Sequence, residues 1–358
     1  MKIAFYADAL DYQYAGIYYY MRHLLDALHE HSSAHDYVIV KSKESPEYPR
    51  FQQVIAPARS FRYLPRFWRY IHTFPKLMND IEPDVVIEAT HFGPFRLREG
   101  IKRAAIIHDL TAVSHAQFHP RMSALIQSNF LEDVAINADI VITNSEYTKT
   151  QVVYEFGIDR RKVDVLHPII PQVDTGIRTL KPIIDEPYLL HVGTLEPRKN
   201  LSRLVEAFDR LRPQYDRLKL VFVGRKGWKN RKLLDKLKRS KYREDIMLTD
   251  YISEDQLWQW YDYASVCVFP SHIEGFGIPI AEALSRGRRV VVNDHASMKE
   301  AGSDLVYYAD ASDLSAFCLK IQKVMDMPGN PPVPDAHLAH FRPQVIVKKF
   351  EEIMSRYG

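Results

Sequence analysis

The chain has 358 residues, which is enough for two domains of ordinary size. Apolar residues make up 46% and charged residues 26%, so the composition is that of a folded globular protein and excludes a largely disordered one. A net charge of +3 is near neutral for this length and gives no sign of a nucleic-acid partner.

Strand-like apolar runs alternate with amphipathic stretches through the first half of the chain, and this alternation predicts a parallel α/β domain. The expected strands are residues 3–7, 37–40, 85–89, 104–108, 140–143 and 163–166. The expected helices are residues 17–29, 66–79, 120–137 and 147–156. A dinucleotide-binding domain would place G-x-G-x-x-G after the first strand. Because Gly16 stands alone there, we expect no tightly bound NAD or FAD.

Residues 168–187 are rich in proline and charge without clear periodicity, so we place a linker at 171–187. The alternation then restarts. It predicts strands at residues 189–193, 219–224, 246–248, 266–269, 289–293 and 305–308, and helices at residues 201–211, 231–240, 254–264, 279–286 and 313–325. The sequence therefore predicts an N-terminal domain of residues 1–170 and a C-terminal domain of residues 188–340, both Rossmann-like and facing each other across a cleft.

The stretch from residue 269 to 287, FPSHIEGFGIPIAEALSRG, leads from a buried strand through a glycine turn into a helix. Gly275 and Gly277 leave the backbone of the turn free to approach a ligand closely, and Pro279 suits the first turn of a helix. The unpaired amides and the positive dipole end of such a helix attract an anion. The sequence therefore predicts an anion site here.

Two carboxylates flank this anion site, Glu274 before the helix and Glu282 about one turn inside it. Because a carboxylate does not bind phosphate, each would accept hydrogen bonds from hydroxyl groups beside the anion. An anionic ligand with hydroxyl groups on both sides is a sugar nucleotide. The alternative for Glu282 is a glutamate that only complements the helix dipole, worth about 0.3–1 kcal/mol.

The segment E-G-F-G-I-P-I-A-E at residues 274–282 resembles the E-x7-E signature of glycosyltransferase family 4, whose members are retaining enzymes of the GT-B architecture. The segment H-V-G-T-L-E-P-R-K-N at residues 191–200 resembles the diphosphate-binding segment of that family. The likeness covers nearly the whole chain in the expected order. It implies an α/β fold of two Rossmann-like domains, with a C-terminal helix at 341–358 that crosses back to the N-terminal domain.

Arg198 and Lys199 follow the predicted strand 189–193, at the carboxyl end where α/β sheets bind ligands. Two adjacent cations can neutralise a diphosphate, and they also accelerate the reaction because charge builds up on the departing phosphate. Taken alone, they would be read as solvated residues before a helix; the Glu274–Glu282 segment downstream favours the diphosphate site. Thr194 stands where some family members carry a further arginine, so either its hydroxyl takes over that task or the diphosphate has one cation fewer.

The resemblance implies roles for the remaining donor-binding residues. Glu282 would hold the hydroxyl groups of the ribose, and Glu274 would contact hydroxyl groups of the transferred sugar. The backbone amides around Phe276, Gly277 and Ile278 would contact the sugar and the phosphates.

In the N-terminal half, His108 and Asp109 end one predicted strand, and His91 follows the strand before it. The resemblance implies that His108 lies close to the anomeric carbon, so we expect it to be catalytic, with His91 and Asp109 near the acceptor. Ordinary buried polar histidines are the alternative. The resemblance also implies that substrate passes close to the backbone at Gly16, which could otherwise be a simple helix-start glycine. For the segment Asn144-Ser145-Glu146, which opens a predicted helix, an N-cap is favoured over catalysis.

Residues 59–76, RSFRYLPRFWRYIHTFPK, combine arginines with aromatic side chains. Such a stretch can dock on an anionic membrane surface to reach a lipid-linked acceptor, or it can be a solvated helix with buried aromatics. Residues 225–243 are also basic, but a solvated surface is favoured there. The segment 224–228 follows a strand and is a candidate for lining the nucleotide site.

Cys267 and Cys318 fall in a predicted strand and a predicted helix, which favours a reducing compartment over a disulfide framework. No apolar run approaches the about 18 residues of a spanning helix. Met1 and Lys2 lead straight into a predicted strand, which leaves no room for a signal peptide. We therefore expect a cytoplasmic protein, peripheral on the inner face of the membrane if residues 59–76 bind lipid.

The sequence thus predicts the retaining transfer of a hexose from a nucleotide-sugar to a hydroxyl of a growing glycan or lipid-linked oligosaccharide. No D-x-D or H-E-x-x-H pattern is suitably placed, so we expect no metal and no other cofactor. GDP-mannose is the preferred donor, because the segment at residues 191–200 resembles bacterial mannosyltransferases of O-antigen or capsule assembly; UDP-glucose, UDP-galactose and other UDP-sugars stay open. The rival functions are a nucleotide-sugar 2-epimerase and a non-catalytic subunit of a glycan-assembly complex.

Overall fold

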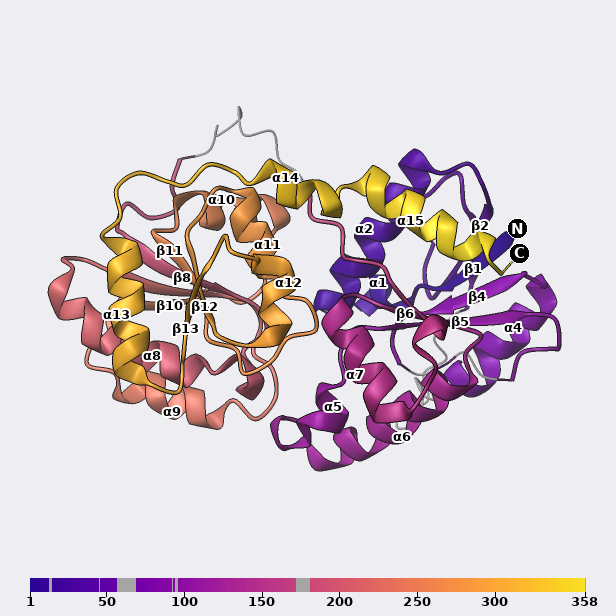
Figure 1. Ribbon diagram of the computed structural model, residues 1–358, viewed down its shortest axis with the longest axis horizontal. Coiled ribbons are helices and arrows are strands. Elements are labelled where there is room, and N and C mark those ends of the chain that lie inside the picture. Colours follow the sequence, from indigo (N-terminus) through magenta and orange to yellow (C-terminus); the bar gives the residue numbers. More distant parts are fainter. Residues whose placement is uncertain are drawn as a thin grey trace. The chain divides into compact units, whose positions relative to one another are not determined.

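The computed structural model describes residues 1–12, 15–44, 46–56, 69–91, 93, 96–171 and 181–357. Its contacts divide the chain into two compact units, and each unit has one parallel sheet flanked by helices (Figure 1). The first unit comprises Met1–His115, Arg121–Ile169 and His340–Gly358. The second unit comprises Ala116–Pro120 and Ile170–Ala339.

The sheet of the first unit has seven parallel strands in the described part of the chain, in the order β3-β2-β1-β4-β5-β6-β7. Its central strands are buried on both faces, which explains their continuous apolar sequences. All six strands expected from the sequence are present. The sequence did not predict β3, because Gln52 and Gln53 belong to an edge strand that is only partly buried. The strands are β1 (Lys2–Tyr6), β2 (Asp36–Lys41), β3 (Gln52–Ile55), β4 (Val85–Glu88), β5 (Lys102–Ile107), β6 (Ile140–Thr143) and β7 (Val163–Val165).

One helix of the first unit differs from its predicted range of 66–79. Residues 66–68 lie outside the described residues, a π-helical turn occupies Arg69–Thr73, and the α-helix begins at Phe74. Pro75 stands in its first turn, where the missing amide is tolerated. The helices are α1 (Asp8–Tyr12), α2 (Ala15–His31), α4 (Phe74–Ile81), α5 (Thr111–Ser114), α6 (Arg121–Asn137), α7 (Glu146–Phe156) and α15 (Pro343–Ser355).

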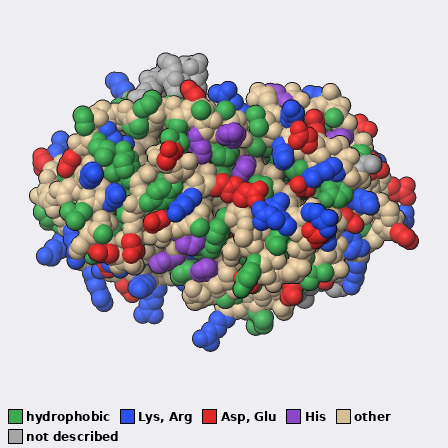
Figure 2. Space-filling model, in the orientation of Figure 1, with side chains coloured by type: hydrophobic (Ala, Val, Ile, Leu, Met, Phe, Trp, Pro, Cys, Tyr) green, Lys and Arg blue, Asp and Glu red, His purple; other side chains and the backbone are tan. Residues whose placement is uncertain are grey.

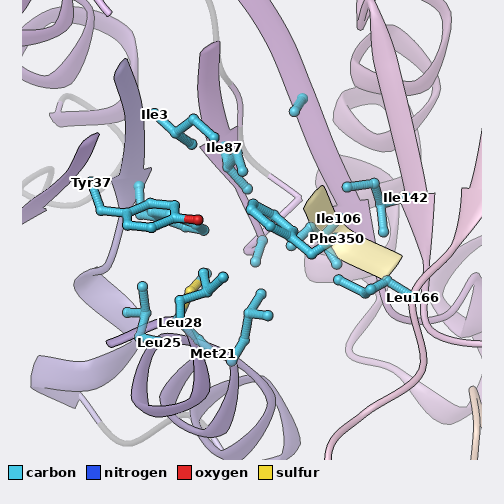
Figure 3. Packing of buried hydrophobic residues seen from close by; sticks show 14 of the residues in the cluster. Ile3, Met21, Leu25, Leu28, Tyr37, Ile87, Ile106, Ile142, Leu166 and Phe350 are labelled. Carbon is cyan, nitrogen blue, oxygen red and sulfur yellow. The ribbon is translucent and has the colours of Figure 1, made fainter. Parts of the chain in front are cut away.

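The last helix, α15, packs against α2 in the first unit, so the predicted return of the C-terminal helix is confirmed. Phe350 stacks on Phe5 of β1 with ring centroids 6.1 Å apart. Figure 3 shows Phe350 among Ile106, Ile142 and other side chains of the central strands. The seam between α15 and the sheet is therefore a hydrophobic core of the first unit.

The sheet of the second unit has six parallel strands in the described residues, in the order β10-β9-β8-β11-β12-β13. Every strand expected here is present. β8 lies between β9 and β11, so the loops that follow these three strands meet at one edge of the sheet. The strands are β8 (Tyr188–Val192), β9 (Lys219–Val223), β10 (Ile246–Leu248), β11 (Val266–Phe269), β12 (Val290–Asn293) and β13 (Tyr307–Ala309). The helices are α8 (Leu201–Leu211), α9 (Arg231–Arg239), α10 (Glu254–Tyr263), α11 (Ile278–Ser285), α12 (Lys299–Gly302), α13 (Leu314–Met325) and α14 (Asp335–Leu338).

On the face of the molecule shown in Figure 2, lysine and arginine side chains are interspersed with aspartate and glutamate, as the net charge of +3 leads one to expect. Within the basic stretch 59–76, residues 59–68 lie outside the described residues. Arg69 is buried, and its Nη1 lies 3.0 Å from Oδ2 of Asp8. None of the described helices combines the length and the apolar character needed to cross a bilayer.

Candidate functional site

Two loops at the carboxyl edge of the second sheet are hydrogen-bonded to each other, and glycine residues allow their backbones to approach closely. The loop after β8 and the loop after β9 pair where Leu195 donates its amide to the Arg225 carbonyl (2.9 Å) and accepts from the amide of Gly227 (3.0 Å). A Cβ at Gly224 would lie 2.2 Å from the carbonyl oxygen of Gly193. Residues 224–228 therefore lie directly against the segment 193–195.

Because the backbones are so close, adding a single methyl group at Gly224 should lower the stability of the protein strongly. Gly224 has φ +142°, which side chains rarely adopt, and its new Cβ would meet backbone. We expect Gly224→Ala to lower the free energy of unfolding by more than about 2 kcal/mol. The control is Gly16→Ala: Gly16 lies in the first turn of α2 with open space around its Cβ position, so the same change should cost nothing or stabilise by about 0.4–1 kcal/mol. Urea unfolding of both variants checks this, and an equal loss in both would contradict the reasoning.

The helix predicted at residues 279–286 is α11, which starts one residue earlier at Ile278. Gly277 precedes it with φ +97° and gives it no side-chain cap. Phe276 is buried, and Ile278 is half-buried in the first turn of the helix. Pro279 in the first turn has no amide hydrogen, and the amide of Ile280 donates to the carbonyl of Gly277 (2.9 Å), which leaves the amide of Ile278 for solvent or a ligand.

Arg198 and Lys199 both form ion pairs with Glu274. Nη1 of Arg198 lies 2.5 Å from Oε2, and Nζ of Lys199 lies 2.7 Å from Oε1. Nε of Arg198 lies 2.5 Å from Oε1 of Glu196. Lys199, Glu196 and Glu274 are buried. We call these four residues the ion cluster; it contains two positive and two negative side chains.

The backbone fixes the two halves of the ion cluster to one another. The amide of His272 donates to the carbonyl of Arg198 (2.8 Å), and Nη1 of Arg198 donates to the carbonyl of Ile273 (3.1 Å). The amide of Glu274 donates to Oγ of Ser297 (3.0 Å). Thus the structure brings Arg198, Lys199 and Glu274 together just before the start of α11. The sequence predicted cations and carboxylate in one region, but not that they neutralise each other.

The two glutamates of the E-x7-E segment differ in ionisation. Burial raises the pKa of Glu274, but the charges of Arg198 and Lys199, with hydrogen bonds from Lys199 and Ser271, hold the pKa well below its ordinary value. In the part of the chain that the structure describes, no cation pairs with Glu282. Burial raises its pKa to about 7, although the hydroxyl of Tyr261, which donates to Oε2 at 2.8 Å, opposes the rise. Glu274 is therefore a fixed carboxylate, whereas Glu282 titrates near neutral pH.

In the chain, Thr194 lies between Gly193, which contacts Gly224, and the ion cluster. Its Cγ2 would be 2.8 Å from a Cβ at Gly227, so its methyl group packs against the loop after β9. The side chain is half-buried.

In the first unit, His108 follows β5 and Asn144 follows β6, two strands that pair side by side. Both side chains are buried, and Nε2 of His108 and Oδ1 of Asn144 have no hydrogen-bond partner among the described residues. The ring of Tyr20 packs edge-on against His108 with centroids 4.8 Å apart. Burial, together with the nearby His91, lowers the pKa of His108 to about 3, so His108 is neutral at physiological pH.

The other predicted residues of the first unit are His91, Asp109 and Gly16. Nε2 of His91 accepts from the amide of His108 (3.1 Å). Oδ1 of Asp109 accepts from the amide (2.9 Å) and the hydroxyl (2.6 Å) of Thr111 at the start of α5. Gly16 is exposed in the first turn of α2. His91 and Asp109 thus support the backbone around His108.

The helix N-cap that the sequence favours within Asn144-Ser145-Glu146 is confirmed: Ser145 caps α7, and its side chain accepts from the amide of Thr148. Asn144 is left with a free acceptor, and the signal was its position directly after a strand, the same as that of His108. Tyr261, which holds Glu282, and His191, which is buried in β8, were also missed. In the described residues no group of three or more His, Cys, Asp or Glu side chains is arranged to hold a metal ion.

Comparison with known proteins identifies related chains. The family model described as Glycosyltransferase Family 4 matches residues 14–172, and the one described as Glycosyl transferases group 1 matches residues 178–335. The chain is 27% identical over 243 residues to O-antigen chain mannosyltransferase B of Escherichia coli, a match that covers 64% of each protein. It is 27% identical over 250 residues to the serotype-specific mannosyltransferase WbdA of Escherichia coli, covering 66% of this chain and 30% of that protein. The match thus spans less than two thirds of the length of these relatives.

Solved structures share the fold. Sucrose-phosphate synthase from Thermosynechococcus elongatus has a TM-score of 0.76 at 18% identity and covers 99% of this chain and 98% of its own. HepE from Anabaena, solved with UDP-glucose, has a TM-score of 0.71 at 15% identity and covers 99% of this chain and 100% of its own. Both are two-domain α/β proteins of the GT-B type, which matches the two parallel sheets described above. The chain therefore belongs to glycosyltransferase family 4 and has the GT-B fold.

Proposed function

We propose that this protein is a retaining glycosyltransferase that moves a hexose from a nucleotide-sugar to a hydroxyl group of a glycan or lipid-linked oligosaccharide. The observation that carries the proposal is the contact of Arg198 and Lys199 with the buried Glu274 beside the start of α11. Two cations and an uncapped helix start suit a diphosphate. A carboxylate among them suits the hydroxyl groups of the attached sugar.

Arg198 and Lys199 would act mainly on the departing diphosphate. As the bond between the sugar and the phosphate breaks, negative charge builds up on the phosphate oxygens. Each charge-assisted hydrogen bond to such an oxygen contributes roughly 1.5–3 kcal/mol, and the buried position increases its effect on the transition state. These cations would do the work that a divalent ion does elsewhere, so we expect activity in the presence of EDTA.

Glu274 and Glu282 would hold the sugars on either side of the diphosphate. In the free protein Glu274 is occupied by two cations. When the phosphates take over those cations, its oxygens become available to hydroxyl groups of the hexose. Glu282 is held at Oε2 by Tyr261, and a carboxylate has enough lone pairs left to accept from the ribose hydroxyls.

His108 and Asn144 offer two buried acceptors at adjacent strand ends. Since His108 is neutral at physiological pH, it would accept a hydrogen bond from a sugar hydroxyl and not supply a charge. The family resemblance supports a front-side displacement. In that step the acceptor oxygen bonds to the anomeric carbon, the bond from that carbon to the phosphate oxygen breaks, and the phosphate oxygen takes the proton.

For the donor we propose GDP-mannose, because two related proteins of Escherichia coli are named mannosyltransferases. UDP-glucose is the second candidate, because HepE, which has the same fold, is solved in complex with it. A thermal-shift panel of GDP, UDP, GDP-mannose and UDP-glucose, followed by an assay of slow donor hydrolysis, decides between them. The proposal fails if no nucleotide raises the melting temperature and no donor is hydrolysed.

The sharpest single test of the site is Lys199→Met. We expect kcat/KM for transfer to fall about 10²–10³-fold, as when one donor to a transition-state anion is removed. Lys238→Met is the matched control, because Lys238 is exposed on α9 and should leave kcat/KM unchanged. Thermal unfolding with and without GDP verifies that both variants fold. Equal activity of the two variants would mean that Lys199 does not act on the diphosphate.

A further inference from the structure

His191 is a buried titratable group that the proposed mechanism does not use. It lies in β8, and its side chain has no exposed surface. Nδ1 is 2.9 Å from the carbonyl oxygen of Val268 on β11. Because a carbonyl only accepts, Nδ1 carries the hydrogen, and in the neutral ring Nε2 is a bare lone pair. Nε2 has no hydrogen-bond partner among the described residues.

The unpartnered nitrogen of His191 faces the ion cluster. The position that a Cβ would take at Gly193 is 3.7 Å from Nε2 of His191 and 3.6 Å from both Cε and Nζ of Lys199. Glycine at this position therefore leaves the imidazole and the ammonium group adjacent to the same small space. On its other sides His191 meets the rings of Phe222 and Phe269, which carry no charge. The charged groups that act on His191 are Lys199 and Glu274.

The charges of the ion cluster are balanced before any ligand arrives, with Arg198 and Lys199 against Glu196 and Glu274. The diphosphate of a nucleotide-sugar brings two more negative charges. In a buried place a nearby negative charge favours the ionised form of a base. We propose that His191 takes up a proton from solvent when the diphosphate of the donor binds, so that a buried imidazolium becomes the third cation of the site. This inference rests on the proposed function.

The proton would form a new Nε2–H bond on His191, while Nδ1–H and its contact with Val268 stay unchanged. In the free protein, burial and the neighbouring charge of Lys199 lower the pKa of His191 to about 4, so it is neutral above pH 5. A bound diphosphate offsets the charge of Lys199 and raises this pKa. Donor binding should therefore strengthen as the pH falls below neutral.

Calorimetric titration with GDP-mannose measures the proton directly. Both phosphates of GDP-mannose are esterified, so the ligand itself does not titrate between pH 5.5 and 8. Heats measured in buffers of different ionisation enthalpy give the number of protons bound. The test variant is His191→Asn, whose amide can still donate to the Val268 carbonyl but cannot hold a proton. We expect the wild type to take up as much as one proton more than His191→Asn at pH 5.5, and no more than the variant at pH 8. The affinity of the wild type divided by that of His191→Asn should increase by at most tenfold for each pH unit as the pH falls.

Glu282 can release a proton on binding the ribose, so the same comparison is made in a Glu282→Gln background. The wild-type protein provides a second measurement: with ¹⁵N-labelled histidine, the Nε2 shift of His191 should move to the imidazolium range when GDP-mannose is added at pH 5.5. A neutral Nε2 in the complex, or equal proton uptake with and without His191, overturns the inference. UDP-glucose replaces GDP-mannose if only the former binds. If neither binds, the proposed function fails and this inference falls with it.

Discussion

Replacing Glu274 with glutamine should tighten the binding of GDP and at the same time slow transfer strongly. In the free protein the carboxylate of Glu274 neutralises Arg198 and Lys199. Without that charge both cations are available to the diphosphate, and we expect the Kd for GDP to fall about tenfold, equivalent to about 1.4 kcal/mol. The transfer rate should fall about a hundredfold or more, because a contact to the transferred sugar is lost.

The Glu274→Gln variant should also be less stable in the absence of ligand. Removing one partner of a buried ion pair leaves uncompensated buried charge and costs about 3–5 kcal/mol. Saturating GDP should restore much of this loss, since it binds only the folded state. Calorimetry with GDP, urea unfolding and a transfer assay measure the three effects. Glu206→Gln on the partly exposed surface of α8 is the control and should change none of them. Weaker GDP binding by Glu274→Gln would contradict the proposed exchange of partners.

The strands and longer helices of both sheets could be predicted because each carries its own periodic signal. Strands β10 and β11 and helix α8 have the predicted bounds. Helices of four residues, such as α5 and α12, could not be found, since they are too short to show a period of 3.6 residues. β3 was missed because an edge strand does not need a continuous apolar sequence.

The residue types of the candidate site could be predicted from strand ends and from the glycine turn, but their pairing could not. Arg198 and Glu274 are 76 residues apart, and only the neighbouring positions of β8 and β11 bring them together. The sequence therefore suggested that Arg198 and Lys199 are unpaired until a phosphate binds. In the structure both are paired with the carboxylate of Glu274. The burial of His191 likewise depends on rings contributed by β9 and β11.

Glu282→Gln should raise the free energy of unfolding and weaken the binding of GDP. Burial raises the pKa of Glu282 from its ordinary value of 4.5 to about 7. Between these two values the folded protein holds a proton that the unfolded chain has lost, so the free energy of unfolding falls as the pH rises. The pKa difference corresponds to a loss of at most about 3 kcal/mol, complete above pH 7. Glutamine has no proton to lose and avoids this loss.

The advantage of Glu282→Gln in urea unfolding should accordingly be about 3 kcal/mol at pH 8 and below about 1 kcal/mol at pH 5. Binding should change in the opposite direction: a carboxylate makes stronger hydrogen bonds to ribose hydroxyls than an amide, so GDP affinity should drop about tenfold or more at pH 8. A stability difference that is the same at both pH values would mean that Glu282 is already ionised in the folded protein at pH 5. Unchanged GDP affinity would mean that Glu282 does not contact the ribose. If both effects appear, the protein retains a buried, poorly compensated carboxylate at a cost in stability because its ligand requires one.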